Sequence, residues 1–338
     1  MPYAVRTLVW LLVLGALGEI GLRLAYSSPK TQFRDPHLEI VRAPSRRLVH
    51  AREGFSWGRV NADGHVDGPP RPGSPRVLAL GDSYTEGLQV PPERRFSELL
   101  AAALDVDVVN AGQSGWSPAH VVRYLEREGG RLAPDGLLVQ VNDGDLPGLV
   151  DPARLHVDVR DPVCAPRLPD GFSTSGPAAW LDTLSGRSAL VYLATSRMGL
   201  LLGRQLDRLR REWTAETRAP TRDAGVPTSQ RAAMRACLAR LAAHPQPLAV
   251  LYVPRLNYGP SGACRPSRPE VGRSYRALGE GLGIVVVDPT QDLCGAYATT
   301  GQPLHGFHNG RMGEGHLNEA GHRVVAEALE PVVGAWFR

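Results

Sequence analysis

A serine follows directly after a short apolar run in the segment Arg76-Val-Leu-Ala-Leu-Gly-Asp-Ser-Tyr-Thr85. The apolar residues predict a buried strand over 76–80, and the small residues after it predict a turn that presents Ser83 at the strand's carboxyl end. In open α/β sheets, ligands bind at this edge. A serine there can act as a nucleophile when a histidine and hydrogen-bond donors converge on it.

Polar residues that could assist such a serine follow in three further blocks. Asn110-Ala-Gly112 ends a predicted strand at 107–110, and Asn142-Asp143 follows another at 137–141. Near the end of the chain, Glu314-Gly-His316-Leu-Asn318 places a carboxylate and a histidine in one short loop. These blocks, in this order, resemble the SGNH (GDSL-type) hydrolases, a family named for Ser, Gly, Asn and His, and in particular its membrane-anchored bacterial members.

The resemblance assigns a role to each matching residue. Ser83 would be the nucleophile, His316 the general base, and Glu314 the carboxylate that orients the histidine. The oxyanion hole would consist of the backbone N–H groups of Ser83 and Gly112 with the side-chain amide of Asn142.

Two positions depart from the family pattern. The acid in the last block is usually an aspartate two or three residues before the histidine, so the longer Glu314 is unusual, and a backbone carbonyl could orient His316 in its place. The third block usually reads Gly-x-Asn-Asp, whereas this chain has Gln140 at the glycine position. Asp82 and Asp143 are expected to fix loops rather than to do chemistry.

Strands and helices alternate along the chain and predict an α/β fold with a doubly wound parallel sheet. The resemblance makes this the flavodoxin-like, five-stranded SGNH hydrolase fold. The predicted strands are 76–80, 107–110, 137–141, 248–253 and 283–287, and the predicted helices cover 93–104, 117–128 and 319–336. An insertion at about 144–230, with a helix predicted over 188–213, is expected to form a lid or substrate wall, or to touch a membrane.

The N-terminal residues predict a membrane segment followed by a tether. Residues 1–27 are apolar over a length that spans a bilayer, which indicates a transmembrane anchor, with a cleaved signal peptide and a core helix as alternatives. Residues 28–75 are rich in Pro and Arg and are expected to form a tether. Within it, 58–65 resembles a segment that precedes the serine block in membrane-anchored members of the family, and the resemblance implies a short hairpin there. The hydrolase domain then covers 76–338.

Composition excludes several classes of function. The net charge of +4 is mild and arginines alternate with acids, so no nucleic-acid partner is expected. No cofactor is expected, and His305 and His308 lack a carboxylate at ligand spacing, so no metal site is predicted. Four cysteines allow three pairings in an oxidising compartment.

The sequence therefore predicts a serine esterase that removes acetyl or another short acyl group from a carbohydrate or lipid ester. It would be anchored in the membrane with its catalytic domain in the periplasm or outside the cell. An O-acetyltransferase acting on a cell-surface polysaccharide is the first alternative, because the four blocks do not distinguish water from a sugar hydroxyl as acceptor. A non-catalytic module that binds a glycan or a protein partner is the second.

Overall fold

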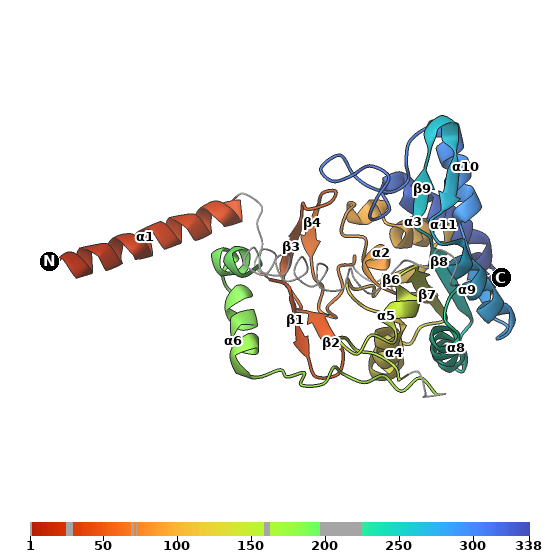
Figure 1. Ribbon diagram of the computed structural model, residues 1–338, viewed down its shortest axis with the longest axis horizontal. Coiled ribbons are helices and arrows are strands. Elements are labelled where there is room, and N and C mark those ends of the chain that lie inside the picture. The colour runs from red at the N-terminus through yellow and green to blue at the C-terminus, as the bar shows by residue number, and fades with distance from the viewer. Residues whose placement is uncertain (1, 25–29, 69–70, 72, 159–162, 197–224) are drawn as a thin grey trace, which may run out of the picture. The chain divides into compact units, whose positions relative to one another are not determined.

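The computed structural model describes residues 2–24, 30–68, 71, 73–158, 163–196 and 225–338 (Figure 1). The chain divides into two units. The larger comprises His37–Phe172 with Gly225–Arg338, and the smaller comprises Met1–Pro36 with Ser173–Ala224.

A parallel sheet of five strands forms the centre of the larger unit. Its strands are β5 (Arg76–Leu80), β6 (Asp107–Asn110), β7 (Gly136–Asn142), β8 (Leu248–Val253) and β11 (Val285–Val287). They lie in the order β11-β8-β7-β5-β6, and every neighbouring pair is parallel. Numbered along the chain, this is the flavodoxin-like order 2-1-3-4-5, which confirms the predicted fold class.

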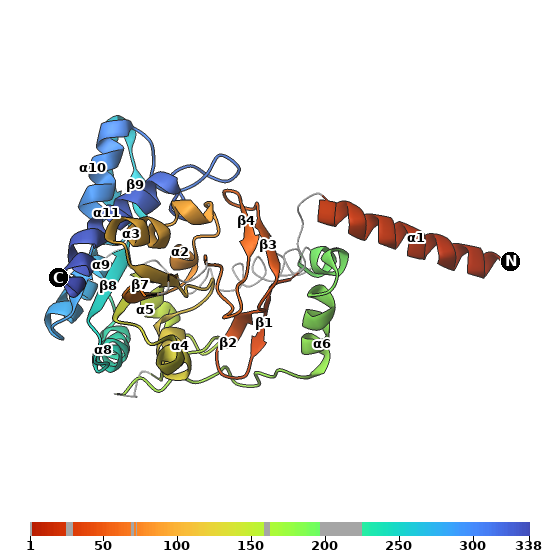
Figure 2. The ribbon, with the colours of Figure 1, turned by 180° about the vertical axis from the view of Figure 1, so that it is seen from behind.

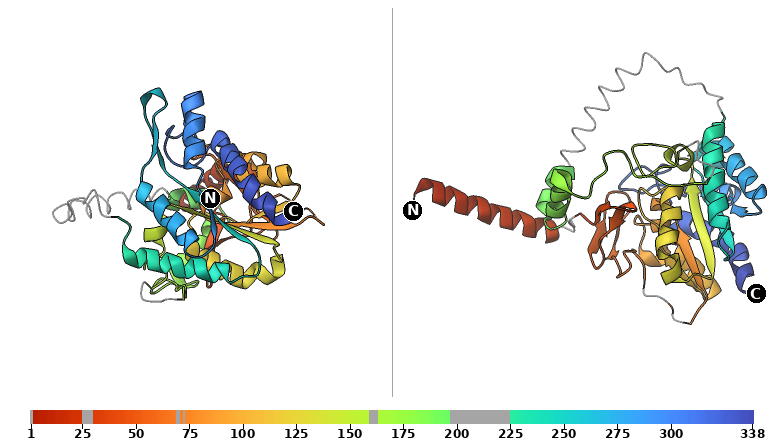
Figure 3. Two further views of the ribbon diagram at one scale, coloured as in Figure 1. Left: turned by 90° about the vertical axis from the view of Figure 1, so that its right-hand side faces the viewer. Right: turned by 90° about the horizontal axis from the view of Figure 1, so that it is seen from below.

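Helices cover both faces of this sheet because successive strand residues point to opposite sides. Leu78 and Leu80 pack in one apolar cluster, while Val77 and Ala79 pack in the other. The first cluster is covered by α4 (Pro118–Leu132), α8 (Thr228–Ala242) and α9 (Pro269–Glu280) (Figure 2). The second is covered by α3 (Phe96–Leu104), α10 (Thr290–Thr300) and α11 (Glu319–Gly334) (Figure 3).

Element boundaries differ from the predicted ones by a few residues. The helix predicted over 93–104 begins at Phe96, because Pro92–Arg94 form a separate 3-10 turn and Arg95 is extended. The helix predicted to end at 128 continues to Leu132. The final helix ends at Gly334, where the 3-10 turn Ala335–Phe337 follows.

The segment before the sheet is folded rather than an open tether. It contains β2 (Glu39–Arg42), followed by β3 (Arg47–His50) and β4 (Ser56–Arg59), which form an antiparallel hairpin. The hairpin covers 47–59, so it overlaps the predicted 58–65 only at Gly58 and Arg59. A small buried apolar cluster holds it in place: Leu48, Val60, Val66 and Leu88. This packing was not predicted, because the segment is rich in Pro and Arg and only a few of its apolar residues are buried.

Arg42 and Glu86 add a buried ion pair between this segment and the short helix α2 (Ser83–Glu86). The guanidinium holds the pKa of Glu86 below its ordinary value against the raising effect of burial. Removing one partner would leave the other charge buried, which costs about 3–5 kcal/mol in comparable pairs. The pair therefore ties β2 to the helix that begins at Ser83.

Two disulfides link loops to helices in the larger unit. Cys164 pairs with Cys237 of α8. Cys264 pairs with Cys294 of α10, which fastens the hairpin of β9 (Leu256–Tyr258) and β10 (Cys264–Pro266). All four cysteines are therefore used.

The smaller unit contains α1 (Tyr3–Leu24), β1 (Gln32–Asp35) and α6 (Gly176–Ser185), with a further helix described over 189–196. Among the described residues, α1 is the helix long and apolar enough to cross a membrane. Near its end, Glu19 accepts hydrogen bonds from the backbone N–H groups of Ala189 and Leu190 (3.0 and 2.9 Å). The rest of the predicted 188–213 helix lies outside the described residues.

Candidate active site

Ser83 lies where the chain leaves β5 and enters α2. Asp82 caps this short helix, its carboxylate accepting from the backbone N–H of Tyr84 (2.9 Å). In the sheet order, β5 lies between β7 and β6, so Ser83 is at the point where the strand order reverses. Ligands bind at this point in doubly wound folds.

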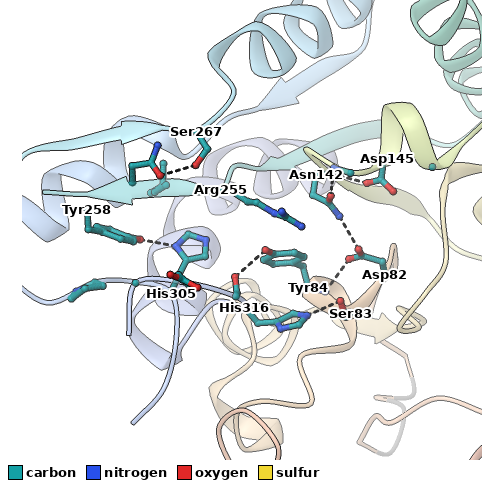
Figure 4. A pocket seen from close by; sticks show the side chains of 18 of the residues that line it. Asp82, Ser83, Tyr84, Asn142, Asp145, Arg255, Tyr258, Ser267, His305 and His316 are labelled. Carbon is teal, nitrogen blue, oxygen red and sulfur yellow. Dashed lines mark hydrogen bonds between the residues drawn. The ribbon is translucent and has the colours of Figure 1, made fainter. Parts of the chain in front are cut away.

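His316 lies opposite Ser83 in the loop before α11. Its Nε2 atom is 2.8 Å from Ser83 Oγ, the distance of a hydrogen bond between a nucleophile and its base (Figure 4). The loop is fixed on its far side, because Asn318 caps α11 by accepting from the Gly321 N–H (3.1 Å). The structure therefore brings these two predicted residues together.

The carboxylate that contacts His316 is Glu53, not the predicted Glu314. Glu53 Oε2 lies 2.7 Å from His316 Nδ1, and its Oε1 accepts the backbone N–H of His316 (2.8 Å). Burial would raise the pKa of Glu53, but the hydrogen bonds from His316 outweigh it and hold that pKa below its ordinary value. Glu314 instead lies 3.4 Å from Arg311, and its side chain is 67% exposed.

The geometry of this loop explains why Glu314 does not reach the imidazole. Gly315 adopts φ +84, and a Cβ there would lie 2.0 Å from Glu53 Oε1. Because Gly315 has no side chain, Glu53 can approach the backbone of the loop closely at this residue. Glu53 lies between β3 and β4 and is 263 residues from His316 in sequence, outside the four blocks. No spacing signal pointed to it.

Tyr84 supports His316 from the other side. Its hydroxyl donates to the carbonyl of Gly315 (3.0 Å), and its ring centroid lies 5.0 Å from that of the imidazole. Since Tyr84 follows Ser83 directly, the nucleophile and its base are positioned by adjacent residues of one helix. The hydrogen bond from Tyr84 to Gly315 thus links the helix that carries Ser83 to the loop that carries His316.

Asn142, the predicted oxyanion donor, ends β7 beside Ser83. Its Nδ2 donates to Asp82 Oδ2 (2.7 Å), which leaves one amide hydrogen, and its Oδ1 accepts from the N–H of Gly144 (2.6 Å). These bonds fix the orientation of the amide. Asp145 holds the backbone of Asn142 (2.7 Å), and burial raises the pKa values of both Asp82 and Asp145.

Gly112, the other predicted donor, does not line the cavity. Its N–H donates to Asn110 Oδ1 (3.1 Å), and its Cα packs against Thr85 and Glu86 of α2. Gly115, three residues later, does line the cavity. Within the described residues, the N–H groups of Ser83 and Gly115 have no protein acceptor, and both residues line the cavity.

Gln140 occupies the position at which the family pattern has glycine. It is buried in β7, and its Oε1 accepts from the Asp82 N–H and from Thr85 Oγ1, both at 3.1 Å. The side chain thus crosses from β7 to the turn that carries Ser83. The departure from the pattern supports the nucleophile turn instead of disrupting it.

A cavity of about 990 Å³ opens above these residues. Ser83, His316 and Asn142 lie on its wall, together with polar residues from the β9–β10 hairpin. The remaining lining includes the aromatic side chains Trp116, Tyr258 and Tyr297 and the charged side chains Arg154 and Arg255. Arg154 comes from the first part of the predicted 144–230 insertion, which therefore contributes to the wall of this cavity.

The remaining histidines do not form a metal centre in the described part of the chain. His305 is buried at the cavity wall, where its Nδ1 pairs with the hydroxyl of Tyr258 (2.6 Å). His308 is exposed. His322 is buried, accepts the Phe96 N–H (3.2 Å), and is structural as predicted.

The fold and this site define an SGNH-type serine ester hydrolase, the class that the four sequence blocks predicted. The profile of the GDSL-like Lipase/Acylhydrolase family matches residues 79–324. The chain belongs to that family. No curated protein matches the chain.

Several solved structures resemble the chain at low identity. TesA is 13% identical with a TM-score of 0.43, covering 77% of this chain and 99% of its own. A catalytic mutant of Axe2, an acetylxylan esterase from Geobacillus stearothermophilus, is 14% identical with a TM-score of 0.42, covering 79% and 97%. The psychrotrophic esterase EstA from Pseudoalteromonas sp. is 14% identical with a TM-score of 0.39, covering 78% and 98%.

Proposed function

We propose that this acylhydrolase removes acetyl or another short acyl group from a carbohydrate ester, using Ser83, His316 and Glu53. The observation that carries the proposal is the continuous chain of hydrogen bonds from Ser83 Oγ through His316 to Glu53. Each distance is that of a hydrogen bond. Glu53 also accepts the backbone N–H of His316, and the imidazole packs beside the ring of Tyr84.

In the acylation step, His316 Nε2 takes the proton of Ser83 as its Oγ attacks the ester carbonyl. The resulting imidazolium is stabilised by the Glu53 carboxylate at Nδ1. The N–H groups of Ser83 and Gly115 and the amide of Asn142 are the proposed donors to the oxyanion. The alcohol then leaves with the proton from His316, and the acyl group remains on Ser83.

In the second step, His316 takes a proton from water as the water attacks the acyl-serine. Collapse of the second tetrahedral intermediate releases the carboxylic acid and returns the proton to Ser83. If a sugar hydroxyl takes the place of water, the same residues transfer the acyl group. The acceptor alone distinguishes a hydrolase from an O-acetyltransferase.

The lining of the cavity supports a short acyl group on a polar molecule. A long acyl chain needs an extended apolar wall to bury its methylenes. Among the described residues that line this cavity, the larger aliphatic side chains are Leu256, Met312 and Pro303. Polar groups such as Asn257 and Ser267, which hydrogen-bond each other (3.1 Å), suit a carbohydrate.

The direct test is cleavage of p-nitrophenyl acetate by the full-length protein, compared with Ser83→Ala. The variant should fold normally but lose at least about 10⁴-fold in kcat, because the nucleophile is removed. Wild-type turnover in a folded Ser83→Ala variant would refute the mechanism. Product analysis with an acetylated glycan and a free glycan acceptor then separates hydrolysis from transfer.

The proposed site of action is the periplasm or the cell exterior, with α1 as a membrane anchor. Two features support this. The helix is 22 residues long, enough to cross a bilayer. Both disulfides require an oxidising compartment during folding.

A further inference from the structure

Two arginines with unpaired side chains line the cavity. Arg154 and Arg255 are both exposed. Within the described part of the chain, neither guanidinium makes a hydrogen bond or an ion pair with a protein group. By contrast, the nearby Arg268 pairs with Glu270 at 3.0 Å.

Arg255 has a fixed backbone and an uncommitted side chain. Its N–H donates to Asp143 Oδ2 (3.2 Å), and its carbonyl accepts from the N–H of Ser267 (2.7 Å). The side chain extends toward Tyr84 and Asn142 at the centre of the site (Figure 4). A guanidinium held at this place is ready to bind a ligand without the cost of ordering its backbone.

The carboxylates that line the cavity interact with other protein groups. Asp82 accepts from the Asn142 amide, and Asp145 accepts from the Asn142 backbone N–H. Glu314 lies beside Arg311. Among the described residues that line the cavity, the charged side chains without a protein partner are therefore the two arginines.

We propose that Arg255, assisted by Arg154, binds a carboxylate of the substrate, and that the ester belongs to an acidic carbohydrate such as a uronic acid glycan. This rests on the proposed function. A guanidinium binds a carboxylate through two parallel hydrogen bonds, which gives both affinity and orientation. Because Arg255 follows β8 and Asn142 ends β7, the neighbouring strand, the carboxylate lies on the Asn142 side of the reacting ester.

The test compares two acetyl esters that differ by one charge. Methyl glucuronoside and methyl glucoside, acetylated at the same hydroxyl, are assayed with the full-length protein in detergent. The wild type should show a higher kcat/KM for the glucuronoside. Arg255→Ala should lower the ratio of the two kcat/KM values by roughly 10- to 100-fold, mainly through KM, as expected for loss of a charge-assisted hydrogen bond. Arg255→Lys should retain part of the preference.

Arg323→Ala is the matched control, because Arg323 is exposed on α11 and does not line the cavity. It should leave the ratio unchanged. Equal kcat/KM values in the wild type, or an unchanged ratio in Arg255→Ala, would overturn the proposal. A stronger preference for acetylated glucose 6-phosphate over the glucuronoside would overturn the carboxylate assignment in favour of a phosphate.

Calorimetry with the unacetylated glucuronoside separates this proposal from the proposed function, because it measures binding without turnover. If the glucuronoside binds in an Arg255-dependent way but the protein cleaves none of the esters, the proposed esterase function is refuted and the arginine site is not. Cleavage of p-nitrophenyl acetate without any Arg255-dependent binding or preference would refute the arginine site alone.

Discussion

His316 is held by three residues from two parts of the chain, Glu53 before β4 and the consecutive residues Ser83 and Tyr84 of α2. Glu53 contacts its Nδ1 and its backbone N–H, Tyr84 contacts the preceding carbonyl, and Ser83 lies at Nε2. Such a ring has little freedom to rotate away from the nucleophile. The orienting carboxylate matters most, because it also stabilises the positive charge that develops during the reaction.

Substituting the two candidate carboxylates separates their roles. Glu53→Gln should lower kcat by about 10²- to 10⁴-fold with little change in KM, since orientation of the base acts in the transition state. Glu314→Gln should stay within about twofold of the wild type, because Glu314 is exposed and paired with Arg311. Kinetics with p-nitrophenyl acetate provide the measurement, and circular dichroism checks folding. The reverse ranking would restore Glu314 as the orienting acid.

At the level of elements, the β3–β4 hairpin is part of the catalytic unit. It delivers Glu53 to a site otherwise built from the carboxyl edge of the sheet. A small apolar cluster fastens it, and Ser56 of β4 donates to the carbonyl of Leu88 (2.6 Å). The buried Arg42–Glu86 pair fastens β2, which precedes the hairpin. Loss of this docking would leave Ser83 and His316 in place but remove the carboxylate.

Gly54, next to Glu53, tests this dependence. It adopts φ +70, and a Cβ there would lie 2.0 Å from the carbonyl oxygen of Gln89. Gly54→Ala should displace the loop and lower kcat toward the level of Glu53→Gln. Gly73→Ala is the control, because Gly73 has φ +85 but nothing within 4 Å, so it carries the same backbone strain without the clash. Equal activity in both variants would show that the loop position does not matter.

The sheet was predictable from sequence because each strand is a short apolar run, with boundaries that are right to within a residue or two. Ser83, Asn142 and His316 could be selected from the sequence because they lie at strand ends or in one short loop, and the structure places all three at one cavity. Glu53 was missed because its position depends on tertiary packing of a Pro- and Arg-rich segment. Gly112 was assigned from the resemblance of its sequence block, and sequence order does not show that its N–H is bonded to Asn110 while Gly115 lines the cavity.

At the scale of the whole molecule, a proposed membrane anchor precedes a hydrolase unit that contains two intrachain disulfides. Arg6 lies on one side of the apolar run, and Arg23 and Lys30 lie on the other, so charge bias gives little guidance on orientation. The disulfides favour an outward-facing catalytic unit.

Protease accessibility tests this orientation. Protease added to intact spheroplasts of an expressing Gram-negative host should digest the chain beyond about residue 30, while the anchor stays with the membrane. A domain protected until the cells are lysed would reverse the orientation. A mature chain that starts near Ser28 would show a cleaved signal peptide instead of an anchor.

The central claim is that Ser83 is the nucleophile of a site completed by Glu53. It is tested most directly by labelling the full-length protein with a fluorophosphonate ester and locating the adduct by peptide mass spectrometry. We predict one adduct per chain, on Ser83, which is absent in Ser83→Ala and forms much more slowly in Glu53→Gln than in Glu314→Gln. An adduct on another residue, or equal labelling rates in the two glutamine variants, would contradict the account.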